Sequence, residues 1–298
     1  MHDHANHNHA RHDGNTSRIA WAFFLNVCFT IIEFIGGWLT NSTAIMADAV
    51  HDLGDSLSIG LAWILSKLSN REASPKFSYG YRRFSLLGAL INGIVLIIGS
   101  IWVISEAIPK LLSPEMPVVE GMLGLAILGV TVNGYAAFKL SKGKSLNEQM
   151  LNWHLLEDVL GWVAVLIVSI ILMFVEWPIL DPVLSIAFTL FILINVLRNL
   201  WATTKLFLQA TPNDDIANTI RELLLSFIEV KKIHHLHFWS LDGEHHVMTV
   251  HLELSKLIEP ARQIQLKSEI AGRLSGFGLE HTTIELEFPN EPCRDRHA

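Results

Sequence analysis

Long apolar stretches alternate with short polar segments over the first two thirds of the chain. A helix needs roughly 20 apolar residues to cross a hydrocarbon layer about 30 Å thick. Six stretches reach that length, and the predicted membrane-spanning helices lie near residues 19–40, 42–67, 84–108, 118–140, 149–175 and 181–206. Proline is expected to set helix ends, so that Pro109 and Pro114 close the third helix and Pro182 opens the sixth.

From residue 211 the pattern changes to that of a mixed, water-soluble domain. The predicted elements are a helix from about 214 to 229, strands at 232–241 and 245–254, a helix at 260–275 and a strand at 281–288. Asp214 or Asp215 is expected to cap the first helix, and Asp242-Gly243 is a hairpin turn signal. This α-β-β-α-β order predicts two helices on one face of a three-stranded sheet. The last ten residues are expected to fray.

The whole chain is therefore predicted to be a membrane protein, an all-α bundle of six transmembrane helices followed by an α+β domain. Its expected parts are an arm at residues 1–17, the membrane bundle at 18–210 and the C-terminal domain at 211–298. Composition agrees, since 50% of the 298 residues are hydrophobic, 17% are charged and mean hydropathy is +0.36. These values exclude a disordered chain, a collagen and a single soluble domain.

The net charge and the cysteine content exclude further classes of function and of metal site. The formal net charge of -7 argues against a basic surface for nucleic acid, so no nucleic-acid partner is expected. Cys28 and Cys293 are isolated, which excludes a disulfide framework and a thiolate-only zinc site.

The distribution of lysine and arginine predicts the orientation in the membrane. Basic residues gather in the connection between the second and third helices and in that between the fourth and fifth: Lys67, Arg71, Lys76, Arg82, Arg83, Lys139, Lys142 and Lys144. The alternate connections carry Lys110 alone. Both termini and the C-terminal domain are therefore predicted to be cytoplasmic.

The N-terminal segment is rich in histidine, at His2, His4, His7, His9 and His12. It lacks the basic and apolar regions of a signal peptide. We interpret it as a flexible arm that gathers metal ions, the alternative being an inert extension.

Ionisable residues at membrane depth are the strongest functional signal. His51 and Asp55 in the second helix, and His154 and Asp158 in the fifth, are each spaced i, i+4. This spacing puts each pair on one helix face, about 40° apart. Two opposed faces would offer two imidazole nitrogens and two carboxylates, a shell suited to tetrahedral Zn²⁺. A single His or Asp would more often be a packed hydrogen-bond partner, but two such pairs argue against that reading.

The other acids of the predicted membrane helices are not expected to be the main metal ligands. Asp48 and Asp52 are expected to line the cavity or to support the ligands. Glu157 points about 100° away from Asp158. Glu33 and Glu106 are lone acids, for which structural or cavity-lining roles are expected.

Four segments of the sequence are similar to motifs of one transporter family. They are Ala47-Asp-Ala-Val-His-Asp-Leu-Gly-Asp55, Phe77-Ser-Tyr-Gly-Tyr-Arg-Arg-Phe84, His154-Leu-Leu-Glu-Asp158 and His234-His-Leu-His-Phe-Trp-Ser-Leu241. From about residue 18 the chain resembles the cation diffusion facilitators, which are proton-coupled zinc exporters. The resemblance implies that the transport site falls on His51, Asp55, His154 and Asp158, as in the zinc-type branch. It also implies a homodimer in the cytoplasmic (inner) membrane of a bacterium.

The C-terminal domain resembles the family's dimerising, metal-sensing domain, which has a metallochaperone-like fold. The resemblance places candidate metal ligands at His234, His251 and Glu287. Their neighbours are His235, His237, His245, His246, His281 and Glu285. Strand alternation puts His235 and His237 on the face opposite His234, so they cannot all bind one ion. The alternative is a set of exposed polar strand residues. Cys293 could add a ligand. The segment 68–83 holds no His or Asp, so we expect no metal site there.

These observations predict a transporter, not an enzyme, that exports zinc, with cadmium or cobalt as further substrates, in exchange for protons. A second, regulatory zinc ion is expected in the C-terminal domain. The first alternative is a membrane metal sensor that signals without transport. The second is a membrane di-metal enzyme, which would need many more histidines at the helix ends.

Overall fold

The structure is a computed structural model that describes residues 9–69, 71, 73–141 and 146–295. The chain forms two compact units, and each is considered by itself. We call residues 1–65 and 88–200 the membrane unit, and residues 66–87 and 201–298 the C-terminal unit.

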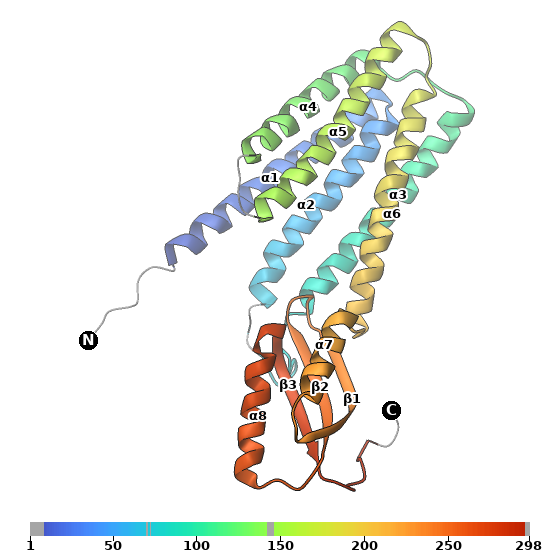
Figure 1. Cartoon of the computed structure of the whole chain (residues 1–298). Helices are drawn as coiled ribbons and strands as arrows, with labels where there is room; N and C mark the ends of the chain where they lie inside the picture. Colours follow the sequence, from blue (N-terminus) through green and yellow to red (C-terminus); the bar gives the residue numbers. More distant parts are fainter. Residues whose placement is uncertain (1–8, 70, 72, 142–145, 296–298) are drawn as a thin grey trace. The chain divides into compact units, whose positions relative to one another are not determined.

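The prediction of six long helices is confirmed (Figure 1). They are α1 (His9–Thr40), α2 (Thr43–Ser69), α3 (Phe84–Leu112), α4 (Val119–Leu140), α5 (Leu146–Phe174) and α6 (Leu180–Phe207). Among the described residues, five of these helices contain an apolar span long enough to cross a membrane. The remaining helix, α2, is also long enough, but it carries Asp48, Asp52 and Asp55. These acids indicate that α2 supplies functional side chains in addition to crossing the membrane.

Two helix ends differ from the predictions. α1 begins at His9, inside the segment that we expected to be a flexible arm, while residues 1–8 lie outside the described part of the chain. α3 does not end at Pro109 but continues to Leu112. A proline removes one backbone donor and disturbs mainly the turn before it. The following turn remains helical, because the Ser113 N–H donates to the Pro109 carbonyl at 2.9 Å.

The start of α2 is held by a carboxylate from another helix. Asp181, in the first turn of α6, is buried and accepts four hydrogen bonds from the chain that enters α2. Its oxygens accept from the Thr43 N–H at 2.7 Å, the Thr43 hydroxyl at 2.8 Å, the Ser42 hydroxyl at 2.5 Å and the Ala44 N–H at 3.3 Å. The carboxylate thus satisfies backbone donors that a helix start leaves free, and fixes α2 against α6.

The interior of the membrane unit is closely packed around Trp162 of α5, which is 1% exposed. Ile45 of α2 and Met122 of α4 belong to the same buried cluster. The indole ring lies against Gly129 of α4, where a side chain would not fit. This close approach of α4 to α5 explains why a glycine occupies the position.

The C-terminal domain has the predicted order of elements (Figure 1). They are α7 (Asp214–Leu225), β1 (Val230–Ser240), β2 (His246–Leu254), α8 (Pro260–Leu274), a short 3₁₀ turn (Ser275–Phe277) and β3 (Leu279–Glu287). The sheet order is β1-β2-β3, with β2 antiparallel to β1 and parallel to β3. One apolar cluster joins Ile220 and Leu224 of α7, Leu266 and Ile270 of α8, and Leu252 of β2. Both helices therefore cover the same core.

The first helix of this domain is capped differently from the prediction. Asn213, not Asp214 or Asp215, is the N-cap, and its side-chain oxygen accepts from the N–H groups of Asp215 and Ile216. α7 ends at Leu225 rather than near Glu229. The predicted hairpin turn is confirmed, because Gly243 has a φ of 105° and Asp242 accepts from two backbone N–H groups.

Candidate metal centres

The first centre lies inside the membrane unit, where α2 faces α5. His51 and Asp55 are one helical turn apart on α2, and Asp158 comes from α5. The His51 Nε2 atom is 3.6 Å from an Asp55 oxygen and 3.6 Å from an Asp158 oxygen. One ligand atom from each of the three residues lies within 4.8 Å of the other two, a separation that one metal ion could span. Asp158 is 8% exposed, while the side chains of His51 and Asp55 are partly buried, with 19% and 23% of their surface exposed.

The fourth predicted ligand, His154, belongs to α5, but its side chain lies outside the described part of the structure. His154 precedes Asp158 by one helical turn, so its backbone position is on the same face of α5. Its role as a ligand stays a prediction.

Further buried acids lie on α1 and α2 near this centre. Asp48 and Asp52 on α2 are 3% and 6% exposed, and Glu33 on α1 is completely buried. Among the described residues, no lysine or arginine forms an ion pair with any of these three. Within the described part of the chain, buried oxygens of Glu33 and Asp48 also have no hydrogen-bond donor. Since a buried charge is costly unless it is paired, this region of the protein is suited to receive a cation.

Glu157 and Glu106 behave differently from these acids. Both side chains are exposed, Glu157 beside Asp158 and Glu106 on α3. The prediction that Glu157 points away from Asp158, which was made from its direction on the helix, is therefore confirmed. Glu33 and Glu106 were both expected to be structural or cavity-lining residues. Glu33 is buried near Asp52 and Asp48, and Glu106 lines a cavity of about 340 Å³ in the membrane unit.

The second centre lies on the sheet of the C-terminal domain and unites His234, His251 and Glu287. His234 of β1 is directly opposite His251 of β2, and Glu287 ends β3. Each oxygen of the Glu287 carboxylate contacts one imidazole, with His234 Nε2 at 2.7 Å and His251 Nδ1 at 2.8 Å. His251 and Glu287 are 7% and 5% exposed. Burial alone would raise the pKa of Glu287, but hydrogen bonds from His251, Cys293 and His234 outweigh it and lower the pKa.

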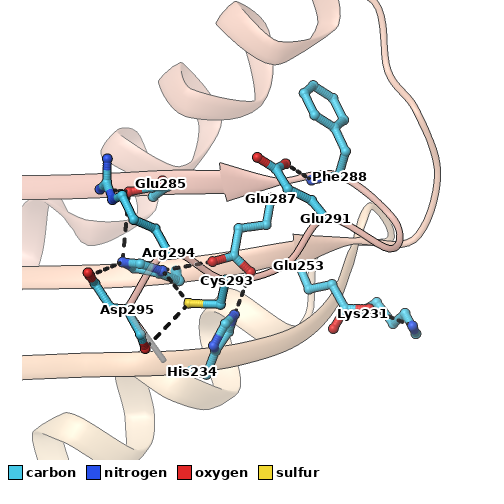
Figure 2. A network of polar contacts seen from close by, with 11 residues as sticks. Lys231, His234, Glu253, Glu285, Glu287, Phe288, Glu291, Cys293, Arg294 and Asp295 are labelled. Atoms are coloured by element: carbon cyan, nitrogen blue, oxygen red, sulfur yellow. Dashed lines mark hydrogen bonds and ion pairs between the residues drawn. The ribbon is translucent and has the colours of Figure 1, made fainter. Parts of the chain in front are cut away.

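Cys293 joins this second centre from the chain after β3. Its sulfur atom is 3.6 Å from His251 Nδ1, and Figure 2 shows it beside Glu287 and near His234. Arg294 pairs with Glu285 at 2.5 Å, and an Asp295 oxygen lies 3.6 Å from His251 Nε2. The expectation that the last ten residues fray is therefore wrong for the described residues up to Asp295. Ligand atoms of His234, His251, Glu287 and Cys293 all lie within 4.8 Å of one another.

The strand that carries His234 is not regular. The β1–β2 register shifts between His234 and His237, and His235 has a positive φ of 49°. The centroid of the His235 ring consequently lies 5.0 Å from that of His251. In a regular strand, alternation would place His235 on the opposite face of the sheet. The prediction that His235 faces away from His234 is wrong, and the bulge is the reason.

Comparisons with known proteins match the chain in two consecutive parts. Residues 19–208 match the cation efflux transmembrane domain, and residues 212–288 match the cytoplasmic domain of cation efflux proteins. The chain belongs to the cation diffusion facilitator, or cation efflux, family. The resemblance noted from the sequence motifs is thereby confirmed.

Several curated relatives of this cation efflux protein match it over nearly its whole length. The zinc transporter ZitB of Yersinia pseudotuberculosis is 32% identical, over 93% of this chain and 89% of the relative. The cadmium, cobalt and zinc/H(+)-K(+) antiporter of Bacillus subtilis is 32% identical, over 94% and 91%. The metal cation efflux system protein CzcD of Cupriavidus metallidurans is 30% identical, over 99% and 93%. The chain is therefore a multi-pass membrane transporter and not an enzyme.

Proposed function

We propose that this cation efflux protein exports zinc from the cytoplasm in exchange for protons. His51, Asp55, His154 and Asp158 form its transport site. The protein is a homodimer in the inner membrane, with both termini in the cytoplasm. Cadmium and cobalt are further candidate substrates.

One observation carries this proposal. His51 and Asp55 of α2 meet Asp158 of α5 inside the membrane unit, with ligand atoms within 4.8 Å of one another. A structural hydrogen-bond network would not explain why, among the described residues, the buried acids Glu33, Asp48 and Asp52 have no lysine or arginine partner. A site that receives a divalent cation does, because the cation supplies the missing positive charge.

The ligand types favour zinc. Imidazole and carboxylate together suit a borderline ion in tetrahedral geometry, whereas magnesium and calcium prefer oxygen ligands alone. Two ionised carboxylates would balance the charge of the ion, so the loaded site would be close to neutral within the membrane. The names of the relatives support the same class of substrate, since they include zinc, cadmium and cobalt.

Proton exchange follows from the same atoms. A metal ion needs the lone pairs of neutral imidazole and ionised carboxylate, and protons compete for those lone pairs. A site that opens to a more acidic compartment would release zinc as it takes up protons. Alternating access would then return the protonated site to the cytoplasmic side.

The second centre is proposed as a regulatory zinc site. The residues His234, His251 and Glu287 already point at one another, and two of them are buried. Zinc bound there would replace the contacts of Glu287 with the two rings by metal bonds. It would stabilise the three-stranded sheet of this domain by joining β1, β2 and β3 through one ion.

A flux measurement tests the proposed transport. The full-length protein in inverted vesicles should take up zinc when the lumen is more acidic than the medium. Collapse of the pH gradient with a protonophore should reduce the rate to that of the membrane alone. A membrane sensor would bind zinc without uptake, and uptake that ignores the pH gradient would contradict proton exchange.

A further inference from the structure

A cavity of about 390 Å³ lies in the C-terminal unit, between the segment that precedes α3 and the end of α6. Two cationic side chains, Lys76 and Arg83, line it together with apolar groups of Phe77, Phe84, Leu87 and Phe207. All of these residues belong to the same compact unit. The cavity therefore combines positive charge with an apolar wall.

The two cations of this cavity have no counter-ion among the side chains that the structure describes. The neighbouring Arg82 is neutralised, since its guanidinium contacts the Glu280 carboxylate at 2.9 and 3.0 Å and lies 3.9 Å from Asp242. Among the described residues, neither the Lys76 ammonium nor the Arg83 guanidinium has a hydrogen-bond or ion-pair partner. Arg83 is nevertheless half-buried. A partly desolvated charge without a partner favours the binding of an anion.

The apolar wall shows what kind of anion fits. Phe84 and Leu87 form the first turn of α3, and Phe207 is the last residue of α6. Both helices are apolar membrane spans up to these residues. The wall therefore lies at the level where the hydrocarbon layer gives way to lipid headgroups. Aromatic and basic residues are typical of this level.

We propose that the cavity binds an anionic phospholipid. Lys76 and Arg83 contact the headgroup phosphate, and Phe84, Leu87 and Phe207 contact the start of the acyl chains. A free phosphate ion would satisfy the cations but would leave the apolar wall without a partner. A zwitterionic lipid would fill the wall but would bring its own cation beside Arg83. The lipid would connect the segment 76–83 to the ends of two membrane helices.

Native mass spectrometry of the detergent-solubilised full-length protein tests this site. Phosphatidylglycerol should bind the parent more tightly than phosphatidylcholine does. Binding should be about 30-fold weaker in Lys76→Gln/Arg83→Gln, because each basic residue near a membrane surface contributes about fivefold. The conservative variant Lys76→Arg/Arg83→Lys should keep most of the affinity. The control Arg198→Gln/Lys205→Gln removes two exposed cations of α6 and should bind like the parent.

Three outcomes would overturn the proposal. The first is equal affinity of parent and Lys76→Gln/Arg83→Gln for phosphatidylglycerol. The second is equal loss of binding in the α6 control, which would mean that only general charge matters. The third is displacement of the lipid by inorganic phosphate at millimolar concentration, which would make the site one for a soluble anion.

Discussion

At the scale of single residues, His51 is placed between two carboxylates. Its Nε2 atom is 3.6 Å from oxygens of both Asp55 and Asp158. Its imidazole is one of the two nitrogen ligands of the proposed site, and it lies directly between the two carboxylates. This position gives His51 a direct influence on which metal is preferred.

We expect His51→Asp to weaken the preference for zinc over cadmium without abolishing transport. A third carboxylate makes the shell more negative and looser in coordination number, so the larger Cd²⁺ is less disfavoured. Parallel zinc and cadmium fluxes in proteoliposomes measure the ratio, with the exposed His237→Asp as the matched control. An unchanged ratio would show that His51 does not set selectivity.

His246 gives the C-terminal domain a dependence on pH. Burial lowers its pKa below the ordinary value of 6.5. The folded state then binds fewer protons than the unfolded state, so the free energy of unfolding is highest above pH 6.5. It falls as the pH drops from 6.5 through the lowered pKa. His246→Gln should reduce this loss, and His237→Gln should not. Melting temperatures of the full-length protein at pH 7.5 and 5.5 measure the difference, and equal losses in parent and His246→Gln would be inconsistent with this role.

The sequence could predict the direction of an individual ligand only where the local geometry of its own helix or strand determines that direction. His51 and Asp55 share a helix face by spacing alone, and Glu157 is separated from Asp158 for the same reason. For Glu33 and Cys293 the sequence predicts a general role but not their neighbours, because those neighbours are far away in the sequence. His235 was placed wrongly, since a β-bulge depends on the partner strand.

At the scale of elements, α2 depends on the carboxylate of Asp181 from α6. Asp181→Ala would leave two hydroxyl groups and two backbone N–H groups without an acceptor in a buried place. We expect a loss of roughly 1–3 kcal/mol in stability, and a lower melting temperature in detergent. Glu120→Ala, which removes an exposed acid from the first turn of α4, is the control and should have little effect. A melting temperature for Asp181→Ala equal to that of the control would contradict this role of Asp181.

The sheet of the C-terminal domain should hold its own zinc ion. In the Asp158→Asn background, where the transport site is impaired, zinc should still raise the melting temperature. Zinc at about 100 times its dissociation constant stabilises the folded state by about 2.7 kcal/mol. Adding His234→Ala should abolish most of this gain, and adding His237→Ala should leave it. The same gain in both double variants would place the zinc ion elsewhere.

Elements were easier to predict than their ends. Apolar length alone predicts six helices, and Asp242-Gly243 predicts the hairpin. Pro109 was misjudged because a proline disturbs the turn before it and leaves the next turn intact. The cap of α7 shifted to Asn213 because several adjacent polar residues can all serve as caps.

At the scale of the whole molecule, the chain joins a cation-receptive membrane unit to a domain with its own core and its own cluster of ligands. Hydropathy predicts the change from apolar helices to a mixed domain near residue 211, but it does not predict that residues 66–87 group with the C-terminal unit. It cannot predict which side chains from distant segments meet, such as those of α2 and α5. The proposed transport depends on these contacts between α2 and α5.

The central claim is that Asp158 binds the exported ion, and the neighbouring Glu157 provides a matched control. Asp158 is buried against His51, whereas Glu157, one residue earlier on α5, is exposed. Both Asp158→Asn and Glu157→Gln remove one carboxylate charge and nearly preserve side-chain volume. Zinc flux in proteoliposomes under an imposed pH gradient should be lost in Asp158→Asn and should stay near the parent rate in Glu157→Gln. Zinc flux near the parent rate in a well-inserted Asp158→Asn protein would contradict the account.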